Sequence, residues 1–232
     1  MSFGPLRTGR LLVRRPEIGD AEAMHQRRNL PDTARYQDWP MPYPLEAARR
    51  TTAGAATMDG PADDEWWMMT IVETATGAIA GDVAIHQSWQ GRAAEIGYTL
   101  HPDHWGKGYG TEAVEAVVDA LIEAGVRRLS ASTHPDNVSS VRLLERLGFQ
   151  YEGREVESYF EADGPDAEAT DGLLFGMTAA TRARWRDRPT TQPSTVRLIE
   201  IDDQNQRAVA ALTTHHSQRS LVAPVSASYG NA

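Results

Sequence analysis

Cysteine is absent from this chain of 232 residues. Disulfides, cysteine-based zinc sites, iron–sulfur clusters and thiol nucleophiles are therefore excluded together. The first fifteen residues carry four arginines and no long apolar segment, and no window approaches the roughly 18 apolar residues that cross a bilayer. We expect neither a secretion signal nor a membrane span, and the lack of cysteine fits a reducing, cytoplasmic setting.

Positive charge is also scarce. The chain has 23 Lys and Arg against 32 Asp and Glu, which gives a formal net charge of −9. This is the wrong overall sign for a protein that binds a phosphate backbone, so nucleic acid is not an expected partner. The GxSxG and HExxH motifs of hydrolases and zinc proteases are missing. His101, Asp103 and His104 come nearest to a metal-ligand set, but they lead into a glycine loop, and we expect no metal.

The residues present predict a soluble α/β protein. Hydrophobic residues make up 41% and charged residues 24% of the chain, enough for one domain with a remainder or for two small ones. Apolar and β-branched runs predict strands at 11–15, 66–72, 78–85, 92–100, 126–132, 149–156 and 173–178. Helical spacing of apolar residues predicts helices from residue 20 and at 45–58, 111–124 and 137–147.

Gly106, Gly108 and Gly110 lie between the strand that ends at Leu100 and the helix that begins at Thr111. Bare backbone N–H groups at such a position can converge on an anion, with help from the helix dipole. The spacing is neither GxxxxGK[ST] nor GxGxxG. The pattern is typical of a phosphate or pyrophosphate site, with a tight strand-to-helix turn as the alternative.

Two sequence blocks resemble one family. Trp105-Gly106-Lys107-Gly108-Tyr109-Gly110 resembles motif A of the GCN5-related N-acetyltransferases (GNAT), [Q/R]-x-x-G-x-[G/A], with Trp at the first position. Together with Thr111-Glu112-Ala113, this departure resembles the RimJ/RimL branch, the acetyltransferases of ribosomal-protein N-termini and their relatives. Residues 137–149, followed by Glu152-Gly153, resemble the same branch's N-x-x-S…L-G-F…E-G signature. The resemblance covers roughly residues 6–178.

The resemblance implies the GNAT fold, a mixed and mostly antiparallel central sheet flanked by helices, in which strand 93–100 splays from its neighbour at a bulge. It implies acetyl-CoA as cosubstrate, with the pantetheine arm paired to the backbone of Leu100 and His101. The amides of Trp105, Gly106, Lys107, Gly108, Tyr109, Gly110 and Thr111 would hold the pyrophosphate. Asn137 would reach the pantetheine, with a plain helix cap as the alternative, and Ser140 would lie near the thioester sulfur.

The implied reaction is direct transfer of the acetyl group to a primary amine. Because α-amino groups titrate near 8 and Lys near 10.4, a base must help to remove a proton, and Glu95 is the candidate. A solvent-facing strand carboxylate is its alternative. Backbone N–H groups near Leu100 could stabilise the oxyanion. Many family members place a Tyr acid seven residues after the Asn, but that position is Leu144 here, so Ser140 takes the acid role by default.

The acceptor is less defined than the donor: a protein N-terminus or a small-molecule amine. Trp39, His86 and Tyr98 are candidate acceptor-binding residues. The segment 152–171 holds eight acids and one base, Arg154, and would either attract a cationic amine or form a solvated face.

We expect an acetyltransferase domain at 1–186, a linker at 187–195 and an extension at 196–232 that resembles the start of a second, truncated GNAT domain. A dimerisation arm, which would make a homodimer, and a loose extension are the alternatives for this tail. The alternative function for the whole chain is a non-catalytic acyl-CoA-binding regulatory module that docks through the tail.

Overall fold

A computed structural model of the chain describes residues 3–160, 169–188 and 200–210. Contacts divide the chain into two units, Met1–Arg186 and Asp187–Ala232. Within the second unit, the structure describes helix α7 (Gln206–Ala210). Most of the linker expected at 187–195 and of the extension expected at 196–232 lies outside the described residues, so the nature of the tail stays a prediction.

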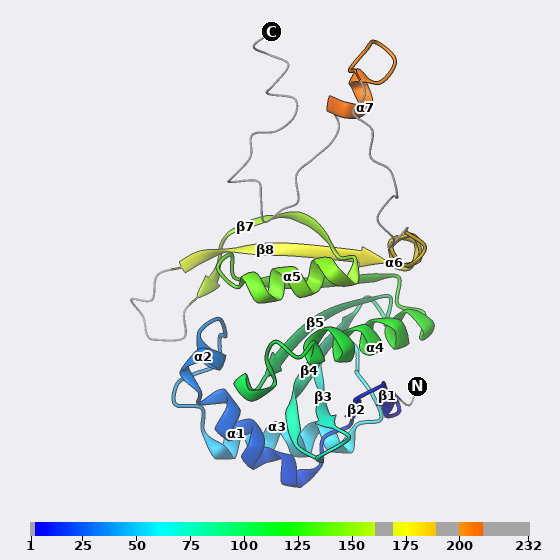
Figure 1. The fold of residues 1–232 in the computed structure, drawn as a ribbon. Helices are drawn as coiled ribbons and strands as arrows, with labels where there is room; N and C mark the ends of the chain where they lie inside the picture. The colour runs from blue at the N-terminus through cyan, green and yellow to red at the C-terminus, as the bar shows by residue number, and fades with distance from the viewer. Residues whose placement is uncertain (1–2, 161–168, 189–199, 211–232) are drawn as a thin grey trace. The chain divides into compact units, whose positions relative to one another are not determined.

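The first unit is built on one eight-stranded sheet with the order β1-β2-β3-β4-β5-β6-β8-β7 (Figure 1). Neighbouring strands are antiparallel, except that β5 and β6 are parallel. This is the mixed, mostly antiparallel sheet that the sequence predicted. The strands are β1 (Leu6–Arg7), β2 (Leu11–Arg14), β3 (Trp66–Glu73), β4 (Ile79–Ser88), β5 (Ala93–Leu100), β6 (Arg128–Thr133), β7 (Gln150–Phe160) and β8 (Ala169–Thr178).

Helices cover both faces of the sheet. On one face α1 meets β4, where Arg27 pairs with Asp82, and on the other α5 meets β5, where Tyr98 contacts Ser140. Helix α4 packs beside α5 (Figure 1). The helical segments of this unit are η1 (Ile18–Asp20), α1 (Ala21–Arg28), α2 (Pro31–Ala34), α3 (Leu45–Thr57), η2 (Pro102–His104), α4 (Tyr109–Glu123), α5 (Val138–Leu147) and α6 (Ala179–Arg186).

Helix α4 forms the centre of the core. Its apolar residues recur at helical spacing, so they share one face, and that face is completely buried. They are Ala113, Val114, Val117, Val118 and Leu121. Helix α5 buries Val141, Leu144 and Leu147 in the same way, whereas Val138, also expected on its apolar face, is 45% exposed. Burial of these two faces holds the first residues of α4 and of α5 at the edge of the sheet.

Strands β5 and β6 separate part-way along their length. They pair from Ala93↔Arg128 to Glu95↔Ser130, while β5 stays paired with β4 as far as Gly81↔Leu100. The family resemblance implied this splay together with a bulge. The β4–β5 register runs without a shift, and the shifts in the sheet lie in β3–β4 and β7–β8. The gap therefore arises from divergence of β5 and β6, without a bulge between β4 and β5.

Helix α6 is the last element of the first unit and ends at Arg186, directly before the expected linker. It is held by Arg182, which is 4% exposed and pairs with Glu115 and Asp119 of α4. The same guanidinium donates to the carbonyl of Leu147 at the end of α5. A buried, fully paired arginine makes α6 an integral part of the first unit. In the described residues, no helix is long and apolar enough to cross a membrane.

Candidate active site

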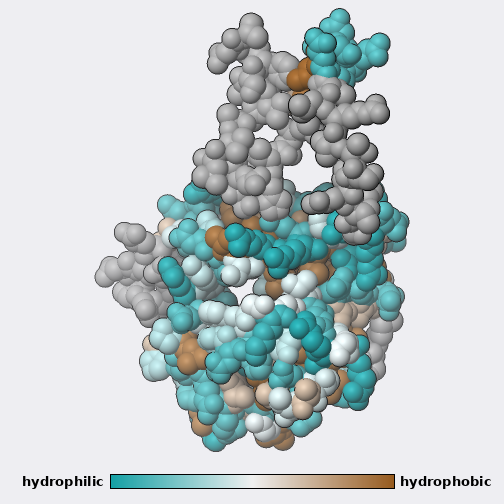
Figure 2. All heavy atoms as spheres, in the orientation of Figure 1, coloured by the Kyte–Doolittle hydropathy of each residue, from teal (hydrophilic) through white to brown (hydrophobic). Residues whose placement is uncertain are grey.

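A cavity of about 750 Å³ opens where β5 leaves β6. Figure 2 shows the molecule hollowed on this side, between α5 and the segment around α2. Three parts of the chain line the cavity: residues 32–37, the end of β5 with the glycine loop, and the first two turns of α5 with Arg146. The lining residues are Asp32, Thr33, Arg35, Tyr36, Gln37, Tyr98, Thr99, Leu100, His104, Trp105, Gly106, Lys107, Gly108, Tyr109, Gly110, Thr111, Asn137, Ser139, Ser140, Arg142, Leu143 and Arg146. The sequence therefore identified most of the cavity wall contributed by β5, the loop and α5.

The glycine loop leads directly into α4. Gly106 and Gly108 have φ of +71° and +80°, and Gly108 is the residue before the first helical residue, Tyr109. This left-handed backbone is strained for any residue with a Cβ. The first intrahelical bond is donated by Glu112 to the carbonyl of Gly108, so the preceding first-turn amides remain available to a ligand. The loop thus presents an anion site at the positive end of a long helix.

The β1–β2 turn holds this loop in place. The Arg10 guanidinium pairs with Glu112 at 2.7 Å and donates to the carbonyl of Lys107 at 2.8 Å. Thr8 donates to the same Glu112 carboxylate at 2.6 Å. These hydrogen bonds, with burial opposing them, give Glu112 a lowered pKa, so the carboxylate is charged at neutral pH. The sequence pattern did not indicate a role for Arg10 or Thr8, because nothing local in the sequence connects them with residue 112.

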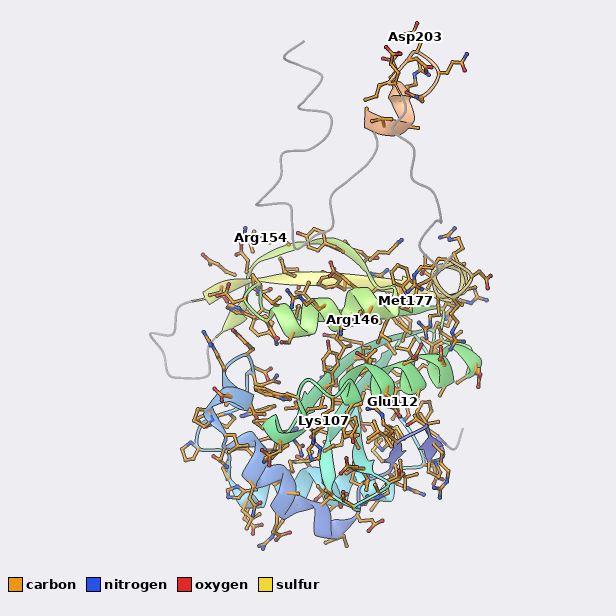
Figure 3. The ribbon with its side chains drawn as sticks, in the orientation of Figure 1. Lys107, Glu112, Arg146, Arg154, Met177 and Asp203 are labelled. Carbon is orange, nitrogen blue, oxygen red and sulfur yellow. The ribbon has the colours of Figure 1, made fainter. Side chains whose placement is uncertain are left out.

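The cavity wall is basic although the whole chain is acidic. Arg35, Lys107, Arg142 and Arg146 line it against one acid, Asp32. Lys107 comes from the glycine loop and Arg146 from α5 (Figure 3). Four cations around a loop of bare amides fit a ligand with several negative charges, so the residues present match a polyanion. The sequence analysis missed Arg142 and Arg146, although their i, i+4 spacing places both on one face of the predicted helix.

Asn137 and Ser140 are joined at the start of α5. The Asn137 side chain accepts a hydrogen bond from the Ser140 N–H at 3.1 Å, so Asn137 is a helix cap, and it also lines the cavity. The Tyr98 hydroxyl lies 2.7 Å from Ser140 Oγ and 3.3 Å from the Ser140 carbonyl oxygen. Burial raises the pKa of Tyr98, which keeps the phenol neutral. Tyr98, expected to bind acceptor, is thus engaged with Ser140.

Glu95 occupies the last paired position before β5 and β6 separate. Its cross-strand neighbour on β4 is His86, whose ring lies tilted against that of Trp66, with 5.3 Å between the ring centroids. Burial raises the pKa of Glu95; His86 opposes this effect and Glu155 adds to it. Glu95 lies at the closed end of the gap and is not part of the cavity lining. A half-buried carboxyl with a raised pKa at such a position suits a general base.

Three other predicted residues have local partners. The His101 N–H donates to the Ala80 carbonyl at 2.8 Å, so this amide belongs to the β4 side, and His101 does not line the cavity. The Trp39 indole N–H donates to the Arg28 carbonyl, and the Arg28 guanidinium lies over the Trp39 ring. His86 is covered by Trp66. The assignment of Trp39 and His86 to the acceptor stays a prediction, since neither lines the cavity.

The backbone of Leu100 suits the role expected of it. Successive amides of a strand point to opposite sides, and the His101 N–H points to β4. The Leu100 N–H therefore points toward the gap.

Among the described residues, no cluster of three or more His, Asp or Glu side chains could hold a metal ion.

The wall around α2 was missed by the sequence analysis. Tyr36 stacks on His134 at 5.1 Å, and the ring of Tyr159 meets the same His134 edge-on at 5.7 Å. The Tyr159 hydroxyl donates to the Tyr36 carbonyl. This aromatic cluster ties Tyr36 to His134, the residue after β6, and to Tyr159 of β7. Thr33, which is 5% exposed and lines the cavity, has a hydroxyl without a hydrogen-bond partner in the described part of the chain.

Comparison with known proteins finds N-acetyltransferases among the relatives of this chain. Residues 10–150 match the family model "Acetyltransferase (GNAT) domain". The chain is 31% identical to the uncharacterized N-acetyltransferase p20 of Bacillus licheniformis over 68% of its own length and 89% of that relative. A ribosomal-protein-S5-alanine acetyltransferase from Vibrio fischeri shares the fold, with a TM-score of 0.64 and 20% identity over 75% of this chain and 96% of the other. Mycobacterium smegmatis RimJ in complex with CoA-disulfide gives a TM-score of 0.61 and 23% identity over 76% and 87%.

Proposed function

The chain belongs to the GNAT family of N-acetyltransferases, and on this basis we propose that it transfers an acetyl group from acetyl-CoA to a primary amine by direct attack in a ternary complex. One observation carries the proposal. The glycine loop at the start of α4 opens into a 750 Å³ cavity whose wall is basic in a chain of net charge −9. A nucleotide-bearing thioester with several phosphates is a polyanion of the kind that such a wall attracts.

The residues that would bind the donor are those of the loop and of α5. The amides from Gly106 to Gly110 and the Thr111 amide would hold the pyrophosphate, with Lys107, Arg142 and Arg146 as counter-charges. The Trp105 amide, which the resemblance included, is left out because it donates to the Pro102 carbonyl at 3.0 Å. Leu100 would pair with the pantetheine arm through its N–H. Asn137 would contact the same arm beside its cap to Ser140. His101 is left out of this set because its N–H is bonded to Ala80.

The reaction needs few protein groups once the two substrates are held together. The amine nitrogen forms a bond to the thioester carbonyl carbon, the C–S bond breaks with its electron pair on sulfur, and the nitrogen loses a proton. Glu95, directly or through a water molecule, accepts that proton, and its raised pKa brings it closer to that of the amine. Ser140 interacts with the departing sulfur. Backbone N–H groups near Leu100 would stabilise the oxyanion.

For the acceptor we propose a protein N-terminus or a small-molecule amine. The chain shares its fold with a ribosomal-protein-S5-alanine acetyltransferase and with RimJ. Glu95, with Glu155 close enough to influence its pKa, gives the acceptor side a negative potential that favours a protonated amine. Residues 32–37 and the aromatic cluster are the wall that such an amine would meet.

Calorimetry with acetyl-CoA, followed by thiol release in the same preparation, tests the proposal. The amine panel contains peptides that begin with alanine or serine, aminoglycosides and polyamines. We expect saturable binding of acetyl-CoA and thiol release that depends on at least one amine. Binding without release by any amine would favour the regulatory acyl-CoA-binding module, and the absence of binding would overturn the assignment of the glycine loop.

A further inference from the structure

Tyr98 and Ser140 form a hydroxyl pair inside the cavity, on the α5 side of the sheet. The two side-chain oxygens are 2.7 Å apart, and both residues line the cavity. The pair lies between the end of β5 and the first turn of α5. The pair therefore lies on the same side of the sheet as the glycine loop and the basic wall, which would bind acetyl-CoA.

No phenol is available from α5 at the position where many family members have their tyrosine. That residue is Leu144, which is fully buried in the core. The hydroxyl that contacts Ser140 comes from β5 instead. A phenol from a different element thus reaches the serine that the sequence analysis assigned to the leaving group.

The chemistry of the two hydroxyls sets the direction of their hydrogen bond. A phenol is a stronger acid and a weaker acceptor than an aliphatic hydroxyl, so the better-matched bond runs from Tyr98 O–H to Ser140 Oγ. The alternative acceptor, the Ser140 carbonyl oxygen, lies farther away, at 3.3 Å. With Tyr98 as the donor, the single Ser140 proton is left for a third group. The cavity is the space in which that group can lie.

We propose that Tyr98 is a positioning residue that holds Ser140 Oγ as an acceptor and thereby turns the Ser140 hydroxyl proton toward the sulfur of the departing thiol. This inference rests on the acetyl transfer proposed above. As the C–S bond breaks, its electron pair moves to sulfur, and Ser140 stabilises the developing thiolate with a hydrogen bond. Ser140 keeps its proton, because a thiol, which ionises near 8.5, is a far stronger acid than an aliphatic hydroxyl. The thiolate later takes a proton from water according to its own pKa.

The kinetic test compares Tyr98→Phe, Ser140→Ala and the double variant. Tyr98→Phe keeps the ring and removes only the hydroxyl. We expect each single variant to lower kcat about tenfold, the loss typical of one hydrogen bond to a charged group, with little change in acetyl-CoA affinity. The double variant should lose no more than Ser140→Ala, because the two hydroxyls act as one unit. The control is Tyr43→Phe, which removes a buried phenol 3.5 Å from Thr51, outside the cavity lining, and should leave kcat unchanged.

A second measurement does not depend on turnover. The thiol pKa of bound CoA is obtained from thiolate absorbance across a pH titration of the complex. We expect this pKa to be about one unit higher in Tyr98→Phe and in Ser140→Ala than in the wild type. An unchanged thiol pKa with unchanged kcat in Tyr98→Phe, or kcat losses that multiply in the double variant, would overturn the inference. A wild type that releases no thiol with any amine while showing the thiol pKa shift would instead refute the proposed function and leave the hydroxyl pair standing.

Discussion

Glu95 and Tyr98 lie on the same strand, β5, and project from opposite faces of the sheet. Glu95 pairs across the strands with His86 on the α1 face, whereas Tyr98 meets Ser140 of α5. The candidate base and the hydroxyl pair are therefore separated by the thickness of the strand, at the point where β5 has left β6. This geometry suits an amine and a thioester that enter from opposite sides and meet in the gap.

Glu95→Gln should abolish most turnover while acetyl-CoA binding is preserved. In the wild type, burial raises the pKa of Glu95, so kcat/KM should fall as the pH drops through a pKa above the usual value of 4.5. The variant should lose this acidic limb. Glu123→Gln, a change at an exposed position in the last turn of α4, is the control. A full-activity Glu95→Gln enzyme would show that another group accepts the proton.

The same variant should be more stable than the wild type at neutral pH. A carboxyl whose pKa is higher in the folded protein contributes stability below its unfolded pKa and loses it as the pH rises through the folded pKa. Because burial raises the pKa of Glu95, ionisation costs stability above that point. Thermal unfolding at pH 7.5 should therefore show a higher Tm for Glu95→Gln, with the difference vanishing near pH 4. An unchanged or lower Tm at pH 7.5 would contradict the desolvation argument.

Arg10→Ala should weaken acetyl-CoA binding without a comparable effect on kcat. Arg10 connects Glu112 to the Lys107 carbonyl and so fixes the glycine loop. A partly exposed pair of this kind is worth about 1 kcal/mol, which corresponds to roughly a fivefold rise in the acetyl-CoA Kd. The matched control is Arg15→Ala, since Arg15 bonds Asp59 and the Met58 carbonyl away from the cavity. Equal losses in both variants would indicate a general effect of charge.

Gly108→Ala should impair both folding stability and donor binding. A Cβ at φ of +80° is strained by about 1–2 kcal/mol, and relief of that strain would displace the first-turn amides of α4. Gly77→Ala carries the same backbone penalty at φ of +75°, in open space in the β3–β4 turn. Both variants should unfold at lower denaturant concentration, but only Gly108→Ala should lose acetyl-CoA affinity in calorimetry. If Gly108→Ala kept its affinity for acetyl-CoA, the left-handed backbone at residue 108 would not be required for donor binding.

Local sequence patterns predicted those parts of the site that are formed by residues close together in the sequence. Strand β5 runs over residues 93–100, against 92–100 expected, because its bounds are set by a short apolar run and the following Pro102. The glycine loop and the start of α5 were likewise predictable, since Gly108 acts through its own backbone conformation and Asn137 through a side-chain cap on the N–H three residues later.

Contacts between distant residues were not predictable in this way. Arg10 depends on Glu112, and Arg182 depends on Glu115 and Asp119 of α4. Each is a charged side chain whose local sequence is also compatible with a surface position, and only the tertiary fold supplies its partner. The contact of Tyr98 with Ser140 belongs to the same class, because it requires the register of β5 against α5.

The divergence of β5 and β6 also affects the stiffness of the sheet. The strands from β1 to β5 and those from β6 to β8 share backbone hydrogen bonds only across the short stretch from Ala93↔Arg128 to Glu95↔Ser130. A pantetheine arm that lies in the gap and bonds to β5 would bridge the two parts of the sheet, β1 to β5 and β6 to β8. Occupancy of the site would then stiffen the whole sheet, and amides at the ends of β5 and β6 should exchange with solvent more slowly when the site is filled.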